Sequence, residues 1–510
     1  MISFLKKNYL LISIIAIGFI IRFLFLLKYG DFWDDEMFSF IYSQKAWPEG
    51  LTYWLWETNP PLHMLILKLW FFVFPTNEFW ARIPSLLFGT STIISVYFLA
   101  KLIWNKNVAL VSAFFISLHS YNIFWSATAR VYSLLMLLSS LSTYYFYKIF
   151  FYNSNKKKDK IFLGLINTLL LFSHLSSILL ILSQAIIIFA INRKKFIAWL
   201  KINLLSFILS AAWLIPSFLI KQNNQLEKSW LLNLHHNFWS ATSPFIFITT
   251  GIHNHHWELL ITGALISLVL INSISRIKKL DIKYTSLLFF LIIPLLITIL
   301  FSVWHIKMLI YTIPIWIIII TQALNKIIKN KIIIIMVIAI FCLIGISNAF
   351  EAIPLTSWSG VKNYIKKDQV EKEQVALIYN NFILRTQIER YLEPNFPYIA
   401  FDLARENNMN WDEFITQKNY LLLDFSSEQI DSWFTKNRLY EYDKIILLQG
   451  KYSYMILLNN VLEKNNFVST SDETPSKGDI TKQKKIKAPI AGNYYLYTYV
   501  KNDSTTSTIQ

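Results

Sequence analysis

The sequence predicts a polytopic α-helical membrane protein with about eleven transmembrane helices, juxtamembrane helices and a C-terminal soluble α/β domain. The first observation is composition: the chain has 510 residues, of which 55% are hydrophobic, and a mean hydropathy of +0.42. Ordinary soluble domains are less apolar. The second observation is that long apolar runs fill the chain as far as residue 350 and then stop. We therefore expect two domains, a transmembrane domain over residues 1–350 and an α/β domain over 351–510.

Eleven apolar runs each predict a membrane helix, since a span needs roughly 20 apolar residues. They cover residues 8–28, 83–104, 108–124, 131–152, 161–173, 175–191, 196–218, 257–275, 284–303, 308–325 and 331–349. The two runs that meet at Ser173-His174 are short, so we expect them to meet inside the outer leaflet. The stretch Pro61–Phe74 is also short for a span, and we expect it to lie along that leaflet or dip into it. The first run lacks a small-residue cleavage site and predicts an uncleaved first helix.

After residue 350 the pattern changes to short alternating segments, which are typical of strands. These segments read VALIY, YLLLDF, KIILLQ and YYLYTYV. A stretch of roughly 150 residues with this pattern is within the usual size of a domain.

The charge balance indicates membrane topology rather than binding to nucleic acid. Residues 1–350 carry 29 Lys and Arg against 11 Asp and Glu, whereas residues 351–510 carry 19 against 20. The basic clusters, which include Lys156-Lys157-Lys158 and Arg193-Lys194-Lys195, all fall on one side if the N-terminus is cytoplasmic. We therefore expect residues 30–80, residues 220–256 and the C-terminal domain on the other side, outside the cytoplasm.

Acidic residues are concentrated directly after the first apolar run. Seven of the eleven in residues 1–350 lie between Asp31 and Glu78, and the tightest group is Asp34-Asp35-Glu36. Membrane proteins avoid carboxylates unless these pair, line a watery cavity or do chemistry. One such carboxylate can take a proton from an acceptor hydroxyl. The alternative is that the group caps the following helix and favours its dipole. Both roles can hold, and the placement predicts an active site at the membrane surface.

Two cations lie at the outer ends of different predicted spans, Arg130 in WSATARVYSLL and Lys307 in WHIKMLIYTIP. Each alone is more typical of an interfacial anchor. Together they can hold an anionic lipid headgroup, Arg130 through its fork and Lys307 as a point charge. The segment Asn59-Pro60-Pro61-Leu62-His63 is by itself more typical of a simple helix start.

Metal and nucleotide sites are weakly indicated. Five histidines lie within residues 220–256 (His235, His236, His253, His255 and His256), but they lack the i, i+4 spacing of zinc sites and have no Cys or carboxylate framework. His174 is more typical of a polar outer-leaflet residue than of a ligand. We expect no metal ligands and no definite cofactor, with a divalent ion left open. The single cysteine, Cys342, excludes a disulfide framework within the chain. The sequence contains no glycine-rich phosphate-binding loop, so it does not predict a protein that is driven by nucleotide hydrolysis.

In this order the motifs resemble those of the GT-C membrane glycosyltransferases. The resemblance is strongest to the bacterial branch of the dolichyl-phosphate-mannose–protein mannosyltransferase family (glycosyltransferase family 39) and to the lipid A aminoarabinose transferases. It covers most of residues 1–325. The segments that carry it are FWDDE, TNPPLHMLILKLW, ARIPSLLFGTSTIISVYFLAKLIW, WSATARVYSLLMLLSSLS, FSHLSSILLILSQ and HIKMLIYTIPIW.

The resemblance implies a GT-C-like transmembrane catalytic domain and a set of site residues. Asp35 would be the catalytic base with Glu36 beside it. Arg130, Lys307 and Arg82 would bind the donor phosphate, and the cavity would be lined by Asp34, Glu57, Asn59, His63, Tyr132 and His174. The chain departs from many relatives at Thr128, where they carry an acidic residue, and at Lys307, where they carry Arg. The second departure keeps the charge but loses the bidentate geometry.

These expectations favour a glycosyltransferase of the bacterial inner membrane, with its active site on the periplasmic side. It would move a sugar from a polyprenyl-phosphate donor to a hydroxyl acceptor on a protein, lipid A or another glycolipid. The alternative is a lipid-linked sugar transporter or flippase, which would place charges at mid-membrane between helices. Here the carboxylates lie in an outer loop, which favours the enzyme. A polysaccharide ligase or polymerase would share the donor chemistry but not the early Asp-Glu element.

Overall fold

The computed structural model divides into two compact units, which are treated separately below. The first comprises Met1–Tyr29 with Phe38–Ile353, and the second Gly30–Met37 with Pro354–Gln510. The structure describes residues 2–57, 59–221, 246–249, 251–252, 257–277, 281–300, 306–328, 330–351, 375–379, 390–391, 399–402, 427–442, 444–450, 461–462, 464–465, 467–469 and 494–501. The predicted boundary between residues 350 and 351 stays a prediction.

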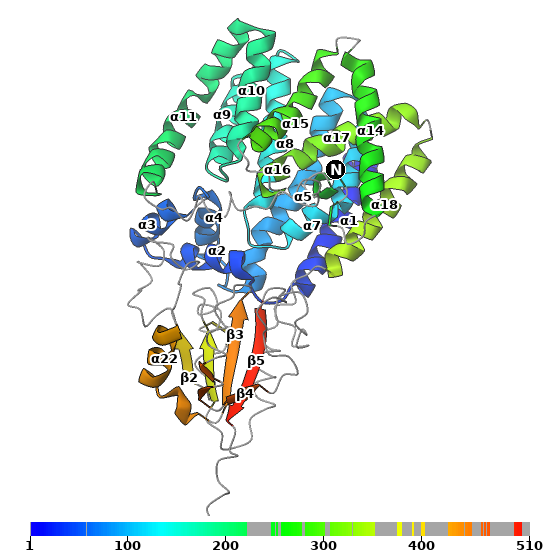
Figure 1. Ribbon diagram of the computed structural model, residues 1–510. Helices are drawn as coiled ribbons and strands as arrows, with labels where there is room; N and C mark the ends of the chain where they lie inside the picture. Colours follow the sequence, from blue (N-terminus) through cyan, green and yellow to red (C-terminus); the bar gives the residue numbers. More distant parts are fainter. Residues whose placement is uncertain are drawn as a thin grey trace, which may run out of the picture. The chain divides into compact units, whose positions relative to one another are not determined.

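The first unit is a bundle of helices (Figure 1), and helix α2 begins in the second unit and continues into the first. The helices are α1 (Ile2–Lys28), α2 (Asp34–Gln44), α3 (Glu49–Trp56), α4 (Leu62–Trp70), α5 (Glu78–Ile103), α6 (Lys106–Leu118), α7 (Ser120–Ser126), α8 (Tyr132–Phe150), α9 (Lys157–Leu171), α10 (Ser177–Ile191), α11 (Arg193–Lys221), α14 (Trp257–Ile277), α15 (Ile282–Leu300), α16 (Ile306–Leu309), η1 (Ile310–Thr312), α17 (Ile313–Ile327) and α18 (Lys331–Glu351). Helix α5 packs against α1, α6 and α8 at the centre of the bundle.

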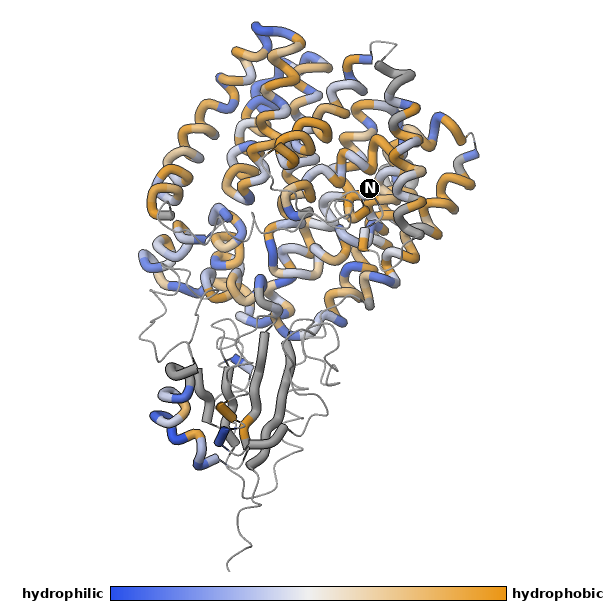
Figure 2. The backbone as a smooth tube through the Cα atoms, in the orientation of Figure 1, coloured by the Kyte–Doolittle hydropathy of each residue, from blue (hydrophilic) through white to orange (hydrophobic). Residues whose placement is uncertain are grey.

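The predicted multi-pass helical membrane protein is confirmed. Within the described residues, each apolar run coincides with one helix or with consecutive helices, and Figure 2 shows apolar residues along most of the bundle. Six of the described helices are long and apolar enough to cross a membrane, or seven if the bent pair α6–α7 counts as one span. Helices α9 and α10 have 15 residues each, fewer than a span usually needs. The number eleven therefore stays a prediction.

A buried arginine lies at the 58° bend between α6 and α7. Arg22 of α1 is 0% exposed and donates hydrogen bonds to the carbonyl oxygens of Ser117 (2.7 Å) and Ile116 (3.1 Å), and to the side-chain oxygen of Asn122. The last carbonyls of a helix lack partners within it, and its C-terminal dipole favours a cation. Arg22 therefore caps the C-terminal end of α6 inside the bundle. We did not predict a buried charge within α1.

The short helices α9 and α10 are tied to their neighbours by a buried network of amides. Asn167 of α9 donates to Asn203 of α11 (2.7 Å) and to Gln184 of α10 (3.2 Å), and Gln184 donates to Ser142 of α8 (2.6 Å). Ser142 in turn donates to Asn167 (2.6 Å). Buried polar side chains are stable only when their hydrogen bonds are satisfied, so this network fixes how the four helices pack.

Helices α2, α3 and α4 precede the first long helix after α1. Helix α4 has nine residues, too few to cross a bilayer. Its first backbone N–H, that of Leu62, donates to the carbonyl of Phe172 at the end of α9 (2.9 Å). Its Lys68 donates to the carbonyl of Lys45 just after α2 (2.5 Å). These bonds fix α4 against both α2 and the α9–α10 junction.

The described part of the second unit contains a five-stranded sheet of order β2-β1-β3-β5-β4. Strand β1 runs parallel to β2 and β3, whereas β5 runs antiparallel to β3 and β4. The elements are β1 (Val375–Tyr379), β2 (Ile399–Asp402), α22 (Ser427–Lys436), η4 (Leu439–Glu441), β3 (Lys444–Gly450), β4 (Phe467–Ser469) and β5 (Tyr494–Lys501). The segments VALIY, KIILLQ and YYLYTYV are thus confirmed as strands, and YLLLDF lies outside the described residues. A soluble α/β domain stays a prediction.

Candidate active site

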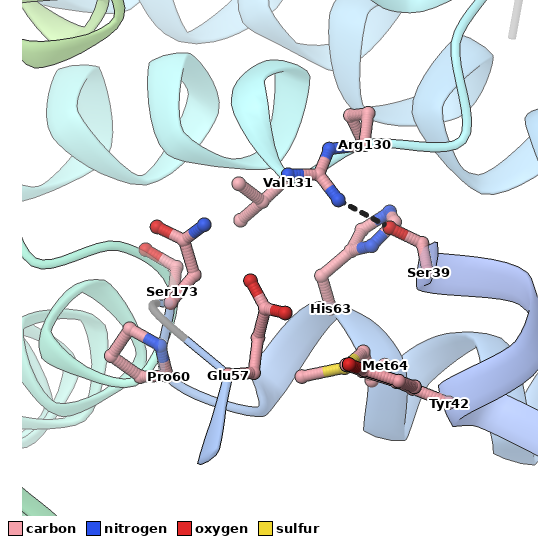
Figure 3. A pocket seen from close by; sticks show the side chains of 10 residues that line it. Ser39, Tyr42, Glu57, Pro60, His63, Met64, Arg130, Val131 and Ser173 are labelled. Atoms are coloured by element: carbon pink, nitrogen blue, oxygen red, sulfur yellow. Dashed lines mark hydrogen bonds between the residues drawn. The ribbon is translucent and has the colours of Figure 1, made fainter. Parts of the chain in front are cut away.

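A small hollow lies within the first unit, where α2, the end of α3, α4, the loop before α8 and the α9–α10 junction meet. Figure 3 shows the side chains of Glu57, His63 and Arg130 extending towards this space from three different elements. The lining residues are Ser39, Tyr42, Glu57, Asn59, Pro60, His63, Met64, Arg130, Val131 and Ser173. The hollow is therefore polar on several sides and has apolar Pro, Met and Val surfaces between them.

Arg130 is held in place by the loop between α7 and α8. The hydroxyl of Thr128 donates to the carbonyl of Trp125 (3.1 Å), and the backbone N–H of Arg130 donates to the carbonyl of Thr128 (2.8 Å). The guanidinium then donates to the hydroxyl of Ser39 on α2 (2.8 Å; Figure 3). A planar fork fixed in this way presents its charge in one direction.

His63 lies in the first turn of α4, directly after the two prolines that start the helix. It is 4% exposed, and its Nε2 atom has no hydrogen-bond partner among the residues that the structure describes. Burial lowers the pKa of His63 to about 3, with a further contribution from the charge of Arg130. The ring is therefore neutral near pH 7, and its buried nitrogen is suited to a hydrogen bond with a ligand.

A second group of residues gathers around His174. The rings of Tyr132 and His174 lie 5.8 Å apart, and the Nζ atom of Lys307 is 5.9 Å from the centre of the Tyr132 ring. Burial, together with the smaller effects of the charges of Arg130 and Lys307, lowers the pKa of His174 to about 3. The backbone N–H of Ser176 donates to His174 Nδ1 (3.1 Å), which leaves the proton of the neutral ring on Nε2.

Arg130, from the loop before α8, and Lys307, from α16, thus both lie near enough to His174 for their charges to act on its ring. The sequence predicted that both cations lie at the outer ends of predicted spans, and their shared effect on His174 is a finding of the structure. Their roles in binding remain predictions.

Of the other predicted residues, Glu57 and Asn59 line the hollow. Glu57 also ends α3, where its backbone N–H donates to the carbonyl of Tyr53 (3.1 Å). Arg82 has a different setting, because it is 1% exposed, donates to the carbonyl of Tyr29 (3.2 Å) and lies 4.6 Å from the ring of Tyr29. Its predicted contact with a phosphate stays a prediction.

The acidic triplet occupies the first turn of α2, which begins at Asp34. The dipole of a helix favours carboxylates in its first turn, and the capping interpretation stays a prediction. Asp35 is half-buried and Glu36 is 0% exposed. All three belong to the second unit, whereas the hollow belongs to the first. Their combination in one active site belongs to the proposal below.

Sequence reasoning missed six residues of the hollow, namely Ser39, Tyr42, Pro60, Met64, Val131 and Ser173. Two of them had a visible signal, because Ser39 and Tyr42 follow the acidic triplet at a helical spacing of three residues. Ser39 matters most, since it accepts the hydrogen bond from Arg130.

Metal binding gains no candidate from the described ranges, in which no group of three or more His, Cys, Asp or Glu side chains could hold an ion. The histidines of residues 220–256 on which a metal site was considered lie outside those ranges.

Comparison with known proteins shows the fold of the chain and a family match over part of it. ArnT from Cupriavidus metallidurans, in a crystal structure bound to undecaprenyl phosphate, matches with a TM-score of 0.57 at 10% identity, over 98% of this chain and 100% of that chain. The oligosaccharyltransferase of Archaeoglobus fulgidus in its apo form matches with a TM-score of 0.53 at 10% identity, over 88% of this chain and 70% of that one. No curated protein matches the sequence.

Together, the described helices and these matches show a multi-pass helical membrane protein with the fold of the two solved structures. Residues 58–216 match the model of the dolichyl-phosphate-mannose-protein mannosyltransferase family. The matched segment contains Asn59, His63, Arg82, Arg130, Tyr132 and His174. Asp35 and Lys307 lie outside it.

Proposed function

We propose that this protein transfers a sugar from a polyprenyl-phosphate donor to a hydroxyl group of a protein, lipid A or another glycolipid. The observation that carries the proposal is that the charges of Arg130 and Lys307 both act on the buried ring of His174, and that Arg130 also lines a polar hollow. The family match supports the class of donor. So does ArnT, which has the same fold and was crystallised with undecaprenyl phosphate.

In the proposed reaction the two cations stabilise the leaving group. The bond between the anomeric carbon and the phosphate oxygen breaks, and the lipid phosphate leaves with the electron pair. Cations that are already held in place stabilise the negative charge that develops on the phosphate, because they do not have to move during the reaction. Arg130 meets this condition because Ser39 and the 127–131 loop restrict it.

Asp35 is the proposed base. The acceptor oxygen attacks the anomeric carbon, and the proton of the acceptor hydroxyl passes to the Asp35 carboxylate. Its half-buried position at a helix start keeps the carboxylate accessible, and Glu36 lies beside it. His63 Nε2, Glu57 and Asn59 supply a donor or acceptor for sugar hydroxyls.

The proposal also has a location. The Lys and Arg clusters favour a cytoplasmic N-terminus in the bacterial inner membrane, which puts the acidic segment and the C-terminal domain in the periplasm. About eleven spans, with α4 making no crossing, satisfy this arrangement.

Steady-state kinetics in nanodiscs with polyprenyl-phosphate-linked sugars test the proposal. In Arg130→Ala and Lys307→Ala we expect donor affinity to fall roughly tenfold or more, the effect of losing one charge-assisted hydrogen bond. Acceptor KM should change little, and Lys307→Arg should retain partial function. If donor affinity is unchanged in both alanine variants, Arg130 and Lys307 are interfacial anchors and do not bind the donor phosphate.

Sugar transfer itself separates the enzyme from the alternative of a flippase. A flippase moves the intact lipid-linked sugar across the bilayer and yields no glycosylated acceptor. Purified protein that moves donor but forms no product would therefore overturn the proposal.

A further inference from the structure

The acidic segment that follows α1 contacts residues almost 360 positions later in the chain. The compact unit that contains Gly30–Met37 also contains everything from Pro354 onward. Within this unit, the backbone N–H of Phe32 donates to the hydroxyl of Tyr391 at 2.9 Å. The guanidinium of Arg390 lies 5.3 Å from the centre of the Phe32 ring and 5.6 Å from that of Tyr391. Phe32 is 0% exposed.

These contacts hold the segment on the N-terminal side of the acidic triplet. Phe32 is two residues before the start of α2 and three before Asp35. On the other side, the first turn is closed by the N–H of Met37, which donates to the carbonyl of Trp33 (3.0 Å). The orientation of the first turn of α2 relative to Phe32 is therefore fixed from both sides. The helical hydrogen bond fixes one side, and Arg390 and Tyr391 fix the other.

The chemistry of the contacts is suited to this task. A buried backbone N–H is costly without an acceptor, so Phe32 has a strong preference for the position in which it reaches the Tyr391 hydroxyl. A guanidinium over an aromatic face adds an attraction that depends on geometry. A base that acts on a hydroxyl must be held within hydrogen-bond reach, and small displacements are expensive for catalysis.

We infer that Arg390 and Tyr391 are positioning residues, through which the C-terminal part of the chain sets the placement of the Asp35 carboxylate. The inference rests on the proposed function, because it assumes that Asp35 is the base. It gives the C-terminal residues a role in the transfer step without any contact of their own with the reacting groups.

The test uses the full chain in nanodiscs and two readouts. The first is amide hydrogen exchange of Phe32, resolved by mass spectrometry. In the wild type we expect this amide to be protected, and in Tyr391→Phe to exchange at least about tenfold faster, because its acceptor is gone. The second readout is kinetic. Tyr391→Phe should lower kcat by about tenfold, as expected for a displaced catalytic group, and leave donor KM within about twofold.

Matched variants separate positioning from general damage. Tyr440→Phe removes a hydroxyl from the same unit at a side chain that is 40% exposed, and it should change neither readout. Arg390→Lys keeps a cation near Phe32 and should retain more of kcat than Arg390→Ala. This pair also tests the inference if Tyr391→Phe does not fold.

Wild-type exchange at Phe32 as fast as in an unprotected amide, or unchanged kcat in both Tyr391→Phe and Arg390→Ala, would overturn the inference. A fall in donor affinity equal to the fall in kcat would also overturn it, since it would indicate a loss of binding. The exchange measurement does not depend on the reaction. Full activity of Asp35→Asn would remove the proposed base, whereas an inactive Asp35→Asn with normal Tyr391→Phe kinetics would remove only the positioning role.

Discussion

The guanidinium of Arg130 and the hydroxyl of Ser39 are joined by a hydrogen bond of 2.8 Å, although they are 91 residues apart in sequence. The bond connects the loop before α8 to helix α2 and crosses one side of the hollow (Figure 3). It means that the direction of the proposed phosphate-binding charge is set by a small, uncharged residue.

Ser39→Ala should therefore weaken donor binding while every charge remains in place. We expect donor KM to rise by roughly threefold to tenfold, about 1 kcal/mol, because Arg130 loses a fixed acceptor and becomes more mobile. Ser43→Ala is the control, since Ser43 is equally buried on α2 but donates within the helix to the carbonyl of Phe40 (2.6 Å). Equal donor KM values in the two variants would show that Ser39 does not orient Arg130.

Asp35→Asn should abolish transfer while membrane insertion and folding remain intact. The amide has nearly the same shape as the carboxylate but cannot accept the proton, and a general base contributes about 10²–10⁴-fold. Turnover with purified protein measures the effect, and Asp34→Asn should have a smaller one. If the Asp35 variant keeps more than about a tenth of wild-type turnover, another group is the base.

Acid should destabilise the first unit through its buried histidines. The pKa of His63 and that of His174 are each lowered to about 3, whereas an unfolded histidine titrates near 6.5. Between these values the unfolded chain binds more protons than the folded one, so stability falls as pH falls from about 6.5 towards 3. At pH 5 this amounts to about 2 kcal/mol for each histidine. Thermal unfolding in detergent at pH 7 and pH 5 measures it.

His63→Gln is the variant that isolates this effect, because glutamine does not titrate. Its melting temperature should fall less between pH 7 and pH 5 than that of the wild type. The same fall in both proteins would mean that His63 is hydrated enough to be protonated in the folded state.

Arg22 should be essential for the stability of the bundle. Arg22→Leu leaves the carbonyls of Ile116 and Ser117 buried at the end of α6 without their donor. Each unsatisfied group costs about 1–3 kcal/mol, so the melting temperature in detergent should drop by several degrees. Lys101→Ala, at an exposed cation near the end of α5, should have little effect. An unchanged melting temperature for Arg22→Leu would show that another group satisfies the two carbonyls.

The C-terminal part of the chain should lie outside the cytoplasm. A reporter that is active only in the periplasm should be active when it is fused after Asn348, because the Lys and Arg clusters fall on the opposite side. A reporter that is active only in the cytoplasm provides the matched control and should be silent at the same position. Activity of the second reporter would contradict both the span count and the location of the active site.

The helices of this protein could be predicted from its sequence because a lipid-exposed backbone must satisfy its own hydrogen bonds, so that long apolar runs have few conformations available. The run 108–124 shows the limit of this reasoning. It was predicted as one helix, but it bends by 58° between α6 and α7, where Arg22 binds the freed carbonyls. Arg22 and Ser117 are 95 residues apart in the sequence, so no local sequence pattern reveals their contact.

The candidate site follows the same division. The sequence indicated the cations and carboxylates because charges are rare in the transmembrane part. Asn59 and His63 were indicated only by the family resemblance, since their segment by itself is more typical of a helix start. Ser39 was missed because it carries no charge, and its only signal in the sequence is its position three residues after Glu36 in the same helix. The contact of Phe32 with Tyr391 joins residues 359 positions apart, and only the folded chain shows that they meet.

The hydrogen bond from Leu62 to Phe172 (2.9 Å) gives the hollow one fixed wall. It joins the residue before His63 to the residue two positions before His174, so that α4 and the α9–α10 junction move together. A bond of this kind is strong where water is scarce. On another side of the hollow α2 meets the 127–131 loop, where Ser39 and Arg130 are hydrogen-bonded. We expect a ligand that needs more room to break this bond first, because it joins two separate elements through side chains.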